Sequence, residues 1–191
     1  NISSDVGARG DCMYFPVCFL IDISKIDIFK VFPFDSGAYK MFSKYFYHSQ
    51  TVDEFQIKPA TIDEIKHIVM KYWGNNDNYY RGKYNDHLNI NAETYIVQGY
   101  INLITEKGEV PFDERRSTIE IISNKALALN ADSLIAVFAP DDFIRRNQKL
   151  FSKLPSNLEI IVYYTFGGAP SSYNGVIREK VYEYLKNKSI I

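Results

Sequence analysis

The clearest pattern of apolar and polar positions lies in Thr61–Gly74, written TIDEIKHIVMKYWG. Thr61 and Glu64 have the spacing of a capping box, and Gly74 provides a carboxy-terminal stop. The pattern therefore predicts an amphipathic helix. Its apolar stripe consists of Ile62, Ile65, Ile68, Val69 and Tyr72.

Four other stretches are rich in apolar, aromatic and β-branched residues, which predicts strands. They are Cys12–Asp22, Ser117–Ser123, Ser133–Ala139 and Leu158–Tyr164. Pro16 favours a sheet edge or a bulge for the first of them. Ile23–Val31 either continues that strand or forms a turn. The alternation in Ser117–Ser123 indicates a strand with one wet face, and this face carries Glu120.

Start and stop signals predict four more helices. They span Ala38–Tyr47, Ala92–Lys107, a segment from Pro140-Asp141-Asp142 to about Lys153, and Pro170–Lys188. Asp35-Ser36-Gly37 opens the first helix, and Asn91 caps the second. Strands and helices do not alternate regularly, which predicts an α+β fold. We expect a mixed, largely antiparallel sheet with helices packed outside it.

The length of 191 residues suits a single domain over 1–191. Because the chain begins at Asn1 without Met, we expect that a natural amino-terminal segment precedes it. The net charge of −1 provides no overall field toward nucleic acid or anionic lipid. No apolar run approaches membrane-spanning length, so we expect no membrane partner.

The cysteines and histidines give no sign of a metal site. Cys12 and Cys18 share one predicted strand and are too far apart along it to form a disulfide. We therefore expect reduced thiols and a cytoplasmic location. The histidines are scattered, and a zinc site needs more ligands than these residues supply.

Known nucleotide and hydrolase motifs do not explain the chain. There is no G-x-G-x-x-G after a strand, no P-loop and no G-x-S-x-G elbow. The acidic pairs Asp113/Glu114 and Asp141/Asp142 have the character of turn and cap residues, which disfavours a metal-dependent nuclease.

Glu120 is the sharpest candidate for chemistry. It follows Arg115, Arg116, Ser117 and Thr118 and lies on the wet face of its predicted strand. Such a glutamate can point into a cleft. The alternative is a surface carboxylate paired with an arginine.

Three runs resemble ADP-ribosyltransferases of the DarT-like type over roughly half the chain: RRSTIEI, the later SLIAVFAPDDF, and the upstream MYFPVCFL. The resemblance implies an ADP-ribosyltransferase-like fold with NAD as substrate. It gives Glu120 the role of orienting the nicotinamide ribose and polarising the acceptor. The family's early histidine strand has no counterpart, because the first histidine here is His48.

The same resemblance requires groups that bind NAD. A bidentate arginine would hold the pyrophosphate, with Arg9 the first candidate and Arg116 the second. The loop before the predicted Ala38–Tyr47 helix can also cradle an anion through backbone N–H groups, or can be an ordinary cap. The expected NAD-binding residues are Arg9, Asp35, Ser36, Arg116 and Ser117.

The segment Asn75–Asn91 is polar and predicts a mobile surface loop. Stacking faces beside positive charge favour contact with a nucleic acid or protein acceptor, whereas the alternative is a solvated connection. The expected contacts are Tyr79, Tyr80, Arg81, Lys83 and Tyr84.

Two functions follow from different classes. The first is an NAD-dependent ADP-ribosyltransferase, a bacterial toxin or phage-defence effector with a cognate inhibitor protein. The second is a non-catalytic sensor or partner-binding domain of a defence system. Convergence of Glu120 and an arginine in one concave pocket would favour the first.

Overall fold

The computed structural model describes residues 17–46, 51–92, 94–106, 114–165 and 174–191. The contacts gather in two compact units, where the sequence favours one domain. Among the described residues, unit 1 comprises those within Ile28–Asn124, and unit 2 comprises residues 17–27 with those within Lys125–Ile191. Unit 1 is thus an uninterrupted stretch, whereas unit 2 is assembled from both sides of it.

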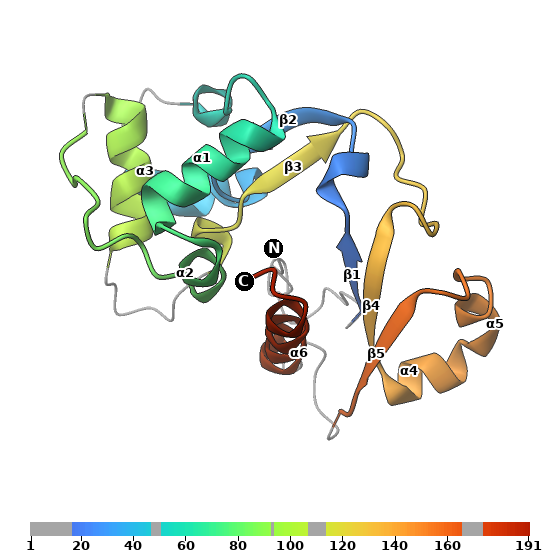
Figure 1. Cartoon of the computed structure of the whole chain (residues 1–191). Coiled ribbons are helices and arrows are strands. Elements are labelled where there is room, and N and C mark those ends of the chain that lie inside the picture. The colour runs from blue at the N-terminus through green and yellow to red at the C-terminus, as the bar shows by residue number, and fades with distance from the viewer. Residues whose placement is uncertain (1–16, 47–50, 93, 107–113, 166–173) are drawn as a thin grey trace. The chain divides into compact units, whose positions relative to one another are not determined.

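Unit 1 is built on a two-stranded antiparallel ribbon of β2 (Ile28–Phe32) and β3 (Glu120–Ser123). Figure 1 shows the two strands side by side. Their register places Phe32 opposite Glu120. The helices of this unit are α1 (Ile62–Trp73), α2 (Asn76–Arg81) and α3 (Tyr95–Thr105), with 3₁₀ helices η2 (Ser36–Tyr45), η3 (Val52–Phe55) and η4 (Glu114–Arg116). β3 is shorter than the predicted strand Ser117–Ser123, because the first three residues of that prediction lie before the residues that pair with β2.

The prediction for α1 is confirmed at both ends. Thr61 Oγ1 accepts a hydrogen bond from the N–H of Glu64 at 3.3 Å. Gly74 ends the helix with φ of 81°, a conformation that residues with a Cβ rarely adopt. On the apolar stripe, Val69 and Tyr72 are buried.

Two other helix predictions in unit 1 need correction. The Asp35-Ser36-Gly37 signal does start a helix, but its turns are 3₁₀ rather than α over Ser36–Tyr45. Ten residues is long for such a helix. The helix predicted from Ala92, which is α3, begins at Tyr95 instead, because Thr94 is its N-cap and its Oγ1 accepts from the N–H of Val97. The N–H of Ala92 donates to Gln98 Oε1.

Phe34 lies at the centre of the aromatic core of unit 1 and is fully buried. Its ring centroid is 5.5 Å from that of Phe46, 5.3 Å from that of Phe55 and 6.4 Å from that of Phe42. Because Phe42 and Phe46 come from the carboxy-terminal end of η2 and its C-cap, and Phe55 comes from η3, packing on Phe34 holds these two helices against the residues that follow β2.

Unit 2 contains a three-stranded mixed sheet of β1 (Cys18–Ile21), β4 (Leu134–Pro140) and β5 (Glu159–Tyr163) in the order β1-β4-β5. β1 is antiparallel to β4, and β4 is parallel to β5. A parallel pair needs a crossover connection.

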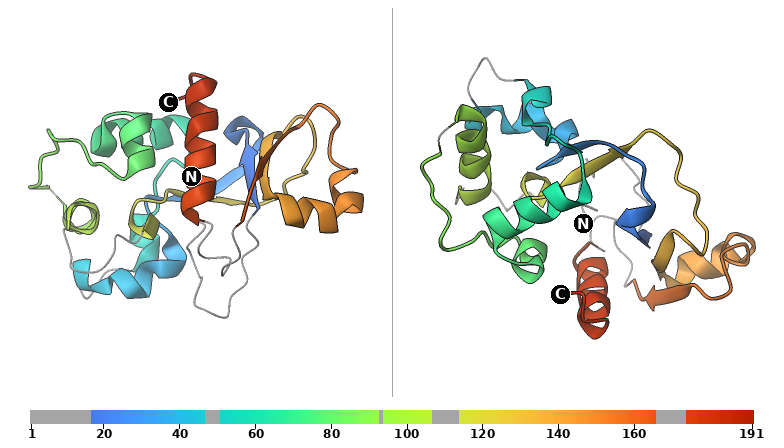
Figure 2. Two further views of the ribbon diagram at one scale, coloured as in Figure 1. Left: turned by 90° about the horizontal axis from the view of Figure 1, so that it is seen from below. Right: turned by 45° about the horizontal axis from the view of Figure 1, so that its top comes forward.

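The crossover between β4 and β5 is helical (Figure 1, Figure 2). It contains α4 (Asp141–Arg146) and α5 (Gln148–Phe151) in place of the single predicted helix. Asn147 separates the two helices, with its amide nitrogen donating to the carbonyl of Phe143 at 2.9 Å.

Helix α6 (Asn174–Asn187) packs on β4 and β5, within the predicted Pro170–Lys188 helix. Its buried residues Ile177, Val181 and Tyr184 face the sheet, where the Tyr184 and Phe138 rings meet edge to face at 5.7 Å. The segment Ile23–Val31, predicted as a continuing strand or a turn, divides into η1 (Ile23–Lys25) and the first residues of β2, a separate strand in the other sheet.

The cysteine prediction is tested only at Cys18, because Cys12 lies outside the described residues. Cys18 has no disulfide partner among the described residues, and burial raises the pKa of its thiol to about 11. At neutral pH this thiol is protonated and a poor nucleophile.

The α+β prediction is confirmed, with strands paired both parallel and antiparallel and helices packed against them. In the part of the chain that the structure describes, no helix combines the length and the apolar character needed to cross a bilayer.

Replacing Gly74 with Ala should destabilise unit 1 by roughly 1–3 kcal/mol, because the new Cβ would be held at a positive φ. The nearest atom to that Cβ is Asn85 Cγ at 3.6 Å, so strain rather than collision causes the loss. Urea unfolding followed by far-ultraviolet circular dichroism measures it.

Gly175→Ala in α6 provides the control, since an added Cβ meets nothing within 4 Å there. It should be neutral or stabilising by up to about 1 kcal/mol. Equal losses from the two substitutions would contradict the assignment of strain to Gly74.

Candidate functional site

Glu120 lies at the first position of β3, where its side chain reaches the start of η2. The N–H of Ser36 donates to Glu120 Oε2 at 3.0 Å, across 84 residues of sequence. The Glu120 side chain is neither fully buried nor fully exposed. One carboxylate oxygen is therefore held by the backbone of a distant segment.

Asp35 stands beside this bond and supplies a second carboxylate. Its Oδ1 accepts from the N–H of Gly37 at 2.9 Å, and its own N–H donates to the carbonyl of Arg115 at 3.0 Å. Burial and the nearby charge of Glu120 raise the pKa of Asp35, while the N–H groups of Gly37 and Ala38 and the Arg115 charge oppose the rise.

Antiparallel pairing explains why these residues meet. The residues that follow β2 must lie beside those that precede β3. The backbone hydrogen bond from Asp35 to Arg115 joins these two stretches just beyond the paired strands. The buried ring of Phe34 anchors the residues between β2 and Asp35. Two stretches that are distant in sequence thus form one site within unit 1.

The structure brings together three of the predicted site residues, namely Glu120, Asp35 and Ser36. It also adds Arg115, whose charge acts on Asp35 and which the prediction left out in favour of its neighbour. The sequence does not show which of the adjacent arginines Arg115 and Arg116 lies near the two carboxylates, because their directions are set by the turn η4 (Glu114–Arg116).

Arg116 turns the other way, into the core of unit 1. It is 5% exposed, its guanidinium lies 5.6 Å from the centroid of the Tyr45 ring, and Nη1 donates to the carbonyl of Glu106 at 3.5 Å. Ser117 is also buried. Binding of NAD by these two residues stays a prediction, and their burial does not favour it.

The first-choice arginine, Arg9, lies outside the described residues. Its role in holding a pyrophosphate stays a prediction. Among the described residues, no group of three or more His, Cys, Asp or Glu side chains is placed to hold a metal ion.

The predicted mobile loop Asn75–Asn91 is wrong in its first part, which forms the helix α2. Asn75 caps this helix, and Gly82 ends it in the left-handed region with φ of 66°. The many asparagines that suggested a loop therefore serve as caps and turn residues.

The proposed acceptor contacts of this segment differ in exposure. Tyr79 and Tyr84 are partly buried against the aromatic core of unit 1. Arg81 and Lys83 are exposed, and Tyr80 is intermediate. Tyr80, Arg81 and Lys83 remain candidates for contact with a partner. The rings of Tyr79 and Tyr84 instead pack against the core.

Chemically, the site offers two carboxylates of different character at the start of one helix. Glu120 accepts a backbone hydrogen bond, and burial together with the charge of Glu120 raises the pKa of Asp35. Paired titratable groups in different environments suit chemistry in which one stabilises charge and the other transfers a proton.

Comparisons with models of protein families, with curated proteins and with solved structures find no match.

Glu120→Gln should lower the pKa of Asp35, because it removes the charge that raises that pKa. The amide oxygen of Gln can still accept from Ser36 N–H, so we expect a stability change within about 1 kcal/mol of zero. Titration of the Asp35 carboxyl carbon by nuclear magnetic resonance measures the shift.

Glu54→Gln is the control, because Glu54 lies in η3 and bonds Thr51 rather than Asp35. The pKa of Asp35 should not change in this variant. An unchanged Asp35 pKa in Glu120→Gln would show that the two carboxylates do not interact.

Proposed function

We propose that this chain is an NAD-dependent ADP-ribosyltransferase that modifies a nucleic acid or protein. The carboxylate of Glu120, fixed by Ser36 N–H next to Asp35, is the observation that supports the proposal most. The likeness of RRSTIEI to the catalytic strand of DarT-like enzymes supports it independently. An ADP-ribosyltransferase-like fold belongs to the same proposal.

The reaction breaks the bond between the nicotinamide nitrogen and the ribose C1′. The bonding electrons leave with nicotinamide, which departs neutral, and positive charge builds on the ribose. A carboxylate close to that carbon stabilises the charge. Glu120 has this role because its oxygen is held in place before the substrate binds.

The acceptor nucleophile then bonds to C1′ and must lose a proton. Asp35 is the proposed base for this step: its carboxylate takes the proton from the acceptor, and burial and the Glu120 charge raise its pKa and so its affinity for that proton. Arg115 lies on the same side and compensates negative charge there. Arg9 remains the proposed ligand of the pyrophosphate, and the burial of Arg116 makes that second candidate the weaker one.

The biological role that fits this chemistry is a bacterial toxin or a phage-defence effector. Consumption of NAD or modification of an essential macromolecule would harm the cell that makes the enzyme. A cognate inhibitor protein is therefore part of the proposal.

A second candidate is a non-catalytic sensor or partner-binding domain of a defence system. The observation that favours it is again the Ser36–Glu120 bond, because a carboxylate engaged by backbone can simply tie β3 to η2. The exposed charges of Arg81 and Lys83 would then belong to a contact surface.

Glu120→Gln should reduce nicotinamide release from NAD by roughly 100-fold or more, because the neutral amide cannot stabilise the positive ribose. Chromatographic measurement of nicotinamide, with candidate nucleic acids and proteins as acceptors, tests this. Glu183→Gln is the matched control, since Glu183 pairs with Lys180 on the surface of α6.

Full activity in Glu120→Gln would reject the catalytic role of Glu120. Absence of turnover in the unaltered protein, with every acceptor, would favour the non-catalytic candidate. Equal losses in both variants would point to general damage instead.

Combined replacement of Tyr80, Arg81 and Lys83 by Ser, Ala and Ala should weaken acceptor modification by about tenfold, through lost stacking and positive charge. Release of nicotinamide to water should not change. Lys66→Ala on α1 is the control for loss of an exposed charge. Undiminished modification in the triple variant would move the contact surface elsewhere.

A further inference from the structure

Tyr79 contacts the backbone immediately before Glu120. Its hydroxyl accepts a hydrogen bond from the N–H of Ile119 at 3.0 Å, although the two residues are 40 positions apart. Ile119 is buried, and a buried N–H requires an acceptor. β3 begins one residue later, so the tyrosine oxygen satisfies the N–H that directly precedes the strand.

The ring that carries this hydroxyl is firmly held. It packs against Trp73 with 5.7 Å between ring centroids and an interplanar angle of 61°. It also contacts the small cluster of Val31, Val69 and Ile119, where β2, α1 and the approach to β3 meet. A packed aromatic ring has few rotamers, so its hydroxyl defines a fixed point.

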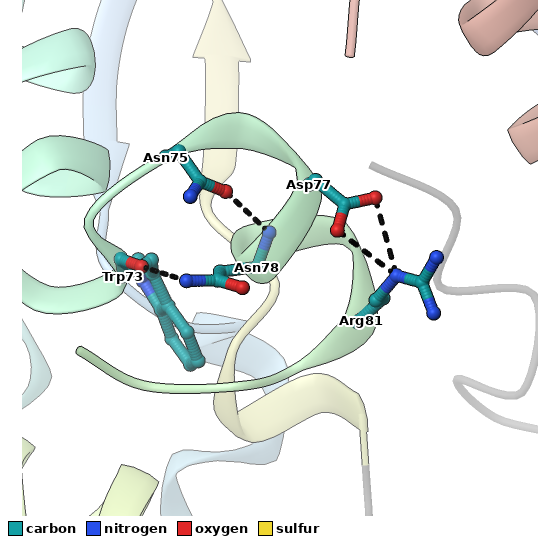
Figure 3. Close-up of polar contacts among 5 residues, drawn as sticks. All are labelled: Trp73, Asn75, Asp77, Asn78 and Arg81. Carbon is teal, nitrogen blue, oxygen red and sulfur yellow. Dashed lines mark hydrogen bonds and ion pairs between the residues drawn. The ribbon is translucent and has the colours of Figure 1, made fainter. Parts of the chain in front are cut away.

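Polar contacts that Figure 3 shows also fix the backbone of α2. Asn75 Oδ1 accepts from the N–H of Asn78 at 2.7 Å, and Asn78 Nδ2 donates to the carbonyl of Trp73 at 3.0 Å. Arg81 and Asp77 pair across one turn at 3.0 Å. These bonds secure α2 on both sides of Tyr79.

We propose that Tyr79 is a positioning residue for Glu120. Its hydroxyl holds the N–H of Ile119, which places the first residue of β3 so that the Glu120 carboxylate meets Ser36 N–H. The catalytic meaning of this placement rests on the proposed function. The placement itself does not, because the contacts that carry it join residues of this chain.

A purely structural role would have a different signature. If the hydroxyl only satisfies a buried N–H, its loss lowers stability and leaves the carboxylates where they were. If it positions Glu120, its loss also releases the Ser36 bond and separates Glu120 from Asp35. The titration of Asp35 reports that separation, because Glu120 contributes to its raised pKa.

Tyr79→Phe tests the proposal, with Tyr80→Phe as the matched control on the same helix. We expect Tyr79→Phe to lower the pKa of Asp35 and to accelerate hydrogen exchange at Ser36 N–H by about tenfold or more, after correction for global unfolding. Tyr80→Phe should change neither quantity. Both are measured by nuclear magnetic resonance without NAD.

Unchanged Asp35 titration and unchanged Ser36 exchange in folded Tyr79→Phe would overturn the proposal. If that variant does not fold, 3-fluorotyrosine at position 79 keeps the shape and weakens the acceptor. It should then produce smaller changes in the same directions, and no change would overturn the proposal equally.

The readout also separates this inference from the proposed function. Failure to release nicotinamide would remove the enzymatic interpretation without affecting either measurement. If release does occur, Tyr79→Phe should lower kcat by about tenfold with little change in KM for NAD, since the substrate contacts remain.

Discussion

The register of β2 against β3 is the constraint on which the site depends. With Phe32 opposite Glu120, the turn that follows β2 must pass the approach to β3. Phe34 is buried in the aromatic core, whereas the next two residues, Asp35 and Ser36, are only partly buried. A shift of this register by one residue would place Glu120 on the other face of the ribbon and separate its carboxylate from that of Asp35.

Electrostatics gives this geometry its chemical interest. Two carboxylates repel each other, and backbone N–H groups at the start of η2 offset that repulsion for each of them. Arg115 adds a positive charge on the same side, whereas Arg116 supports the turn from within. The enzymatic and the partner-binding proposals use the same arrangement and differ in whether a substrate meets the second carboxylate oxygen of Glu120.

Sequence patterns were most informative where local signals agreed with packing. The capping residue Thr61, the stripe and Gly74 located α1 closely, and dense apolar runs located β4 and β5. They failed where a side chain bonds a distant backbone group. The polar composition of Asn75–Asn91 hid a helix, and nothing in the sequence linked Tyr79 to Ile119. The proximity of Asp35 and Glu120 was anticipated only through a family resemblance, because strand register cannot be read from either segment alone.

The order of the two units along the chain has a consequence for biosynthesis. Unit 1 is continuous, and its ends lie together because Ile28 pairs with Ser123. Unit 2 waits for β4, β5 and α6, although β1 has already left the ribosome. The nascent chain must therefore keep the apolar β1 segment unpaired while unit 1 forms. The ion pair of Asp27 with Lys125, 3.1 Å long, joins the two chain segments that make up unit 2.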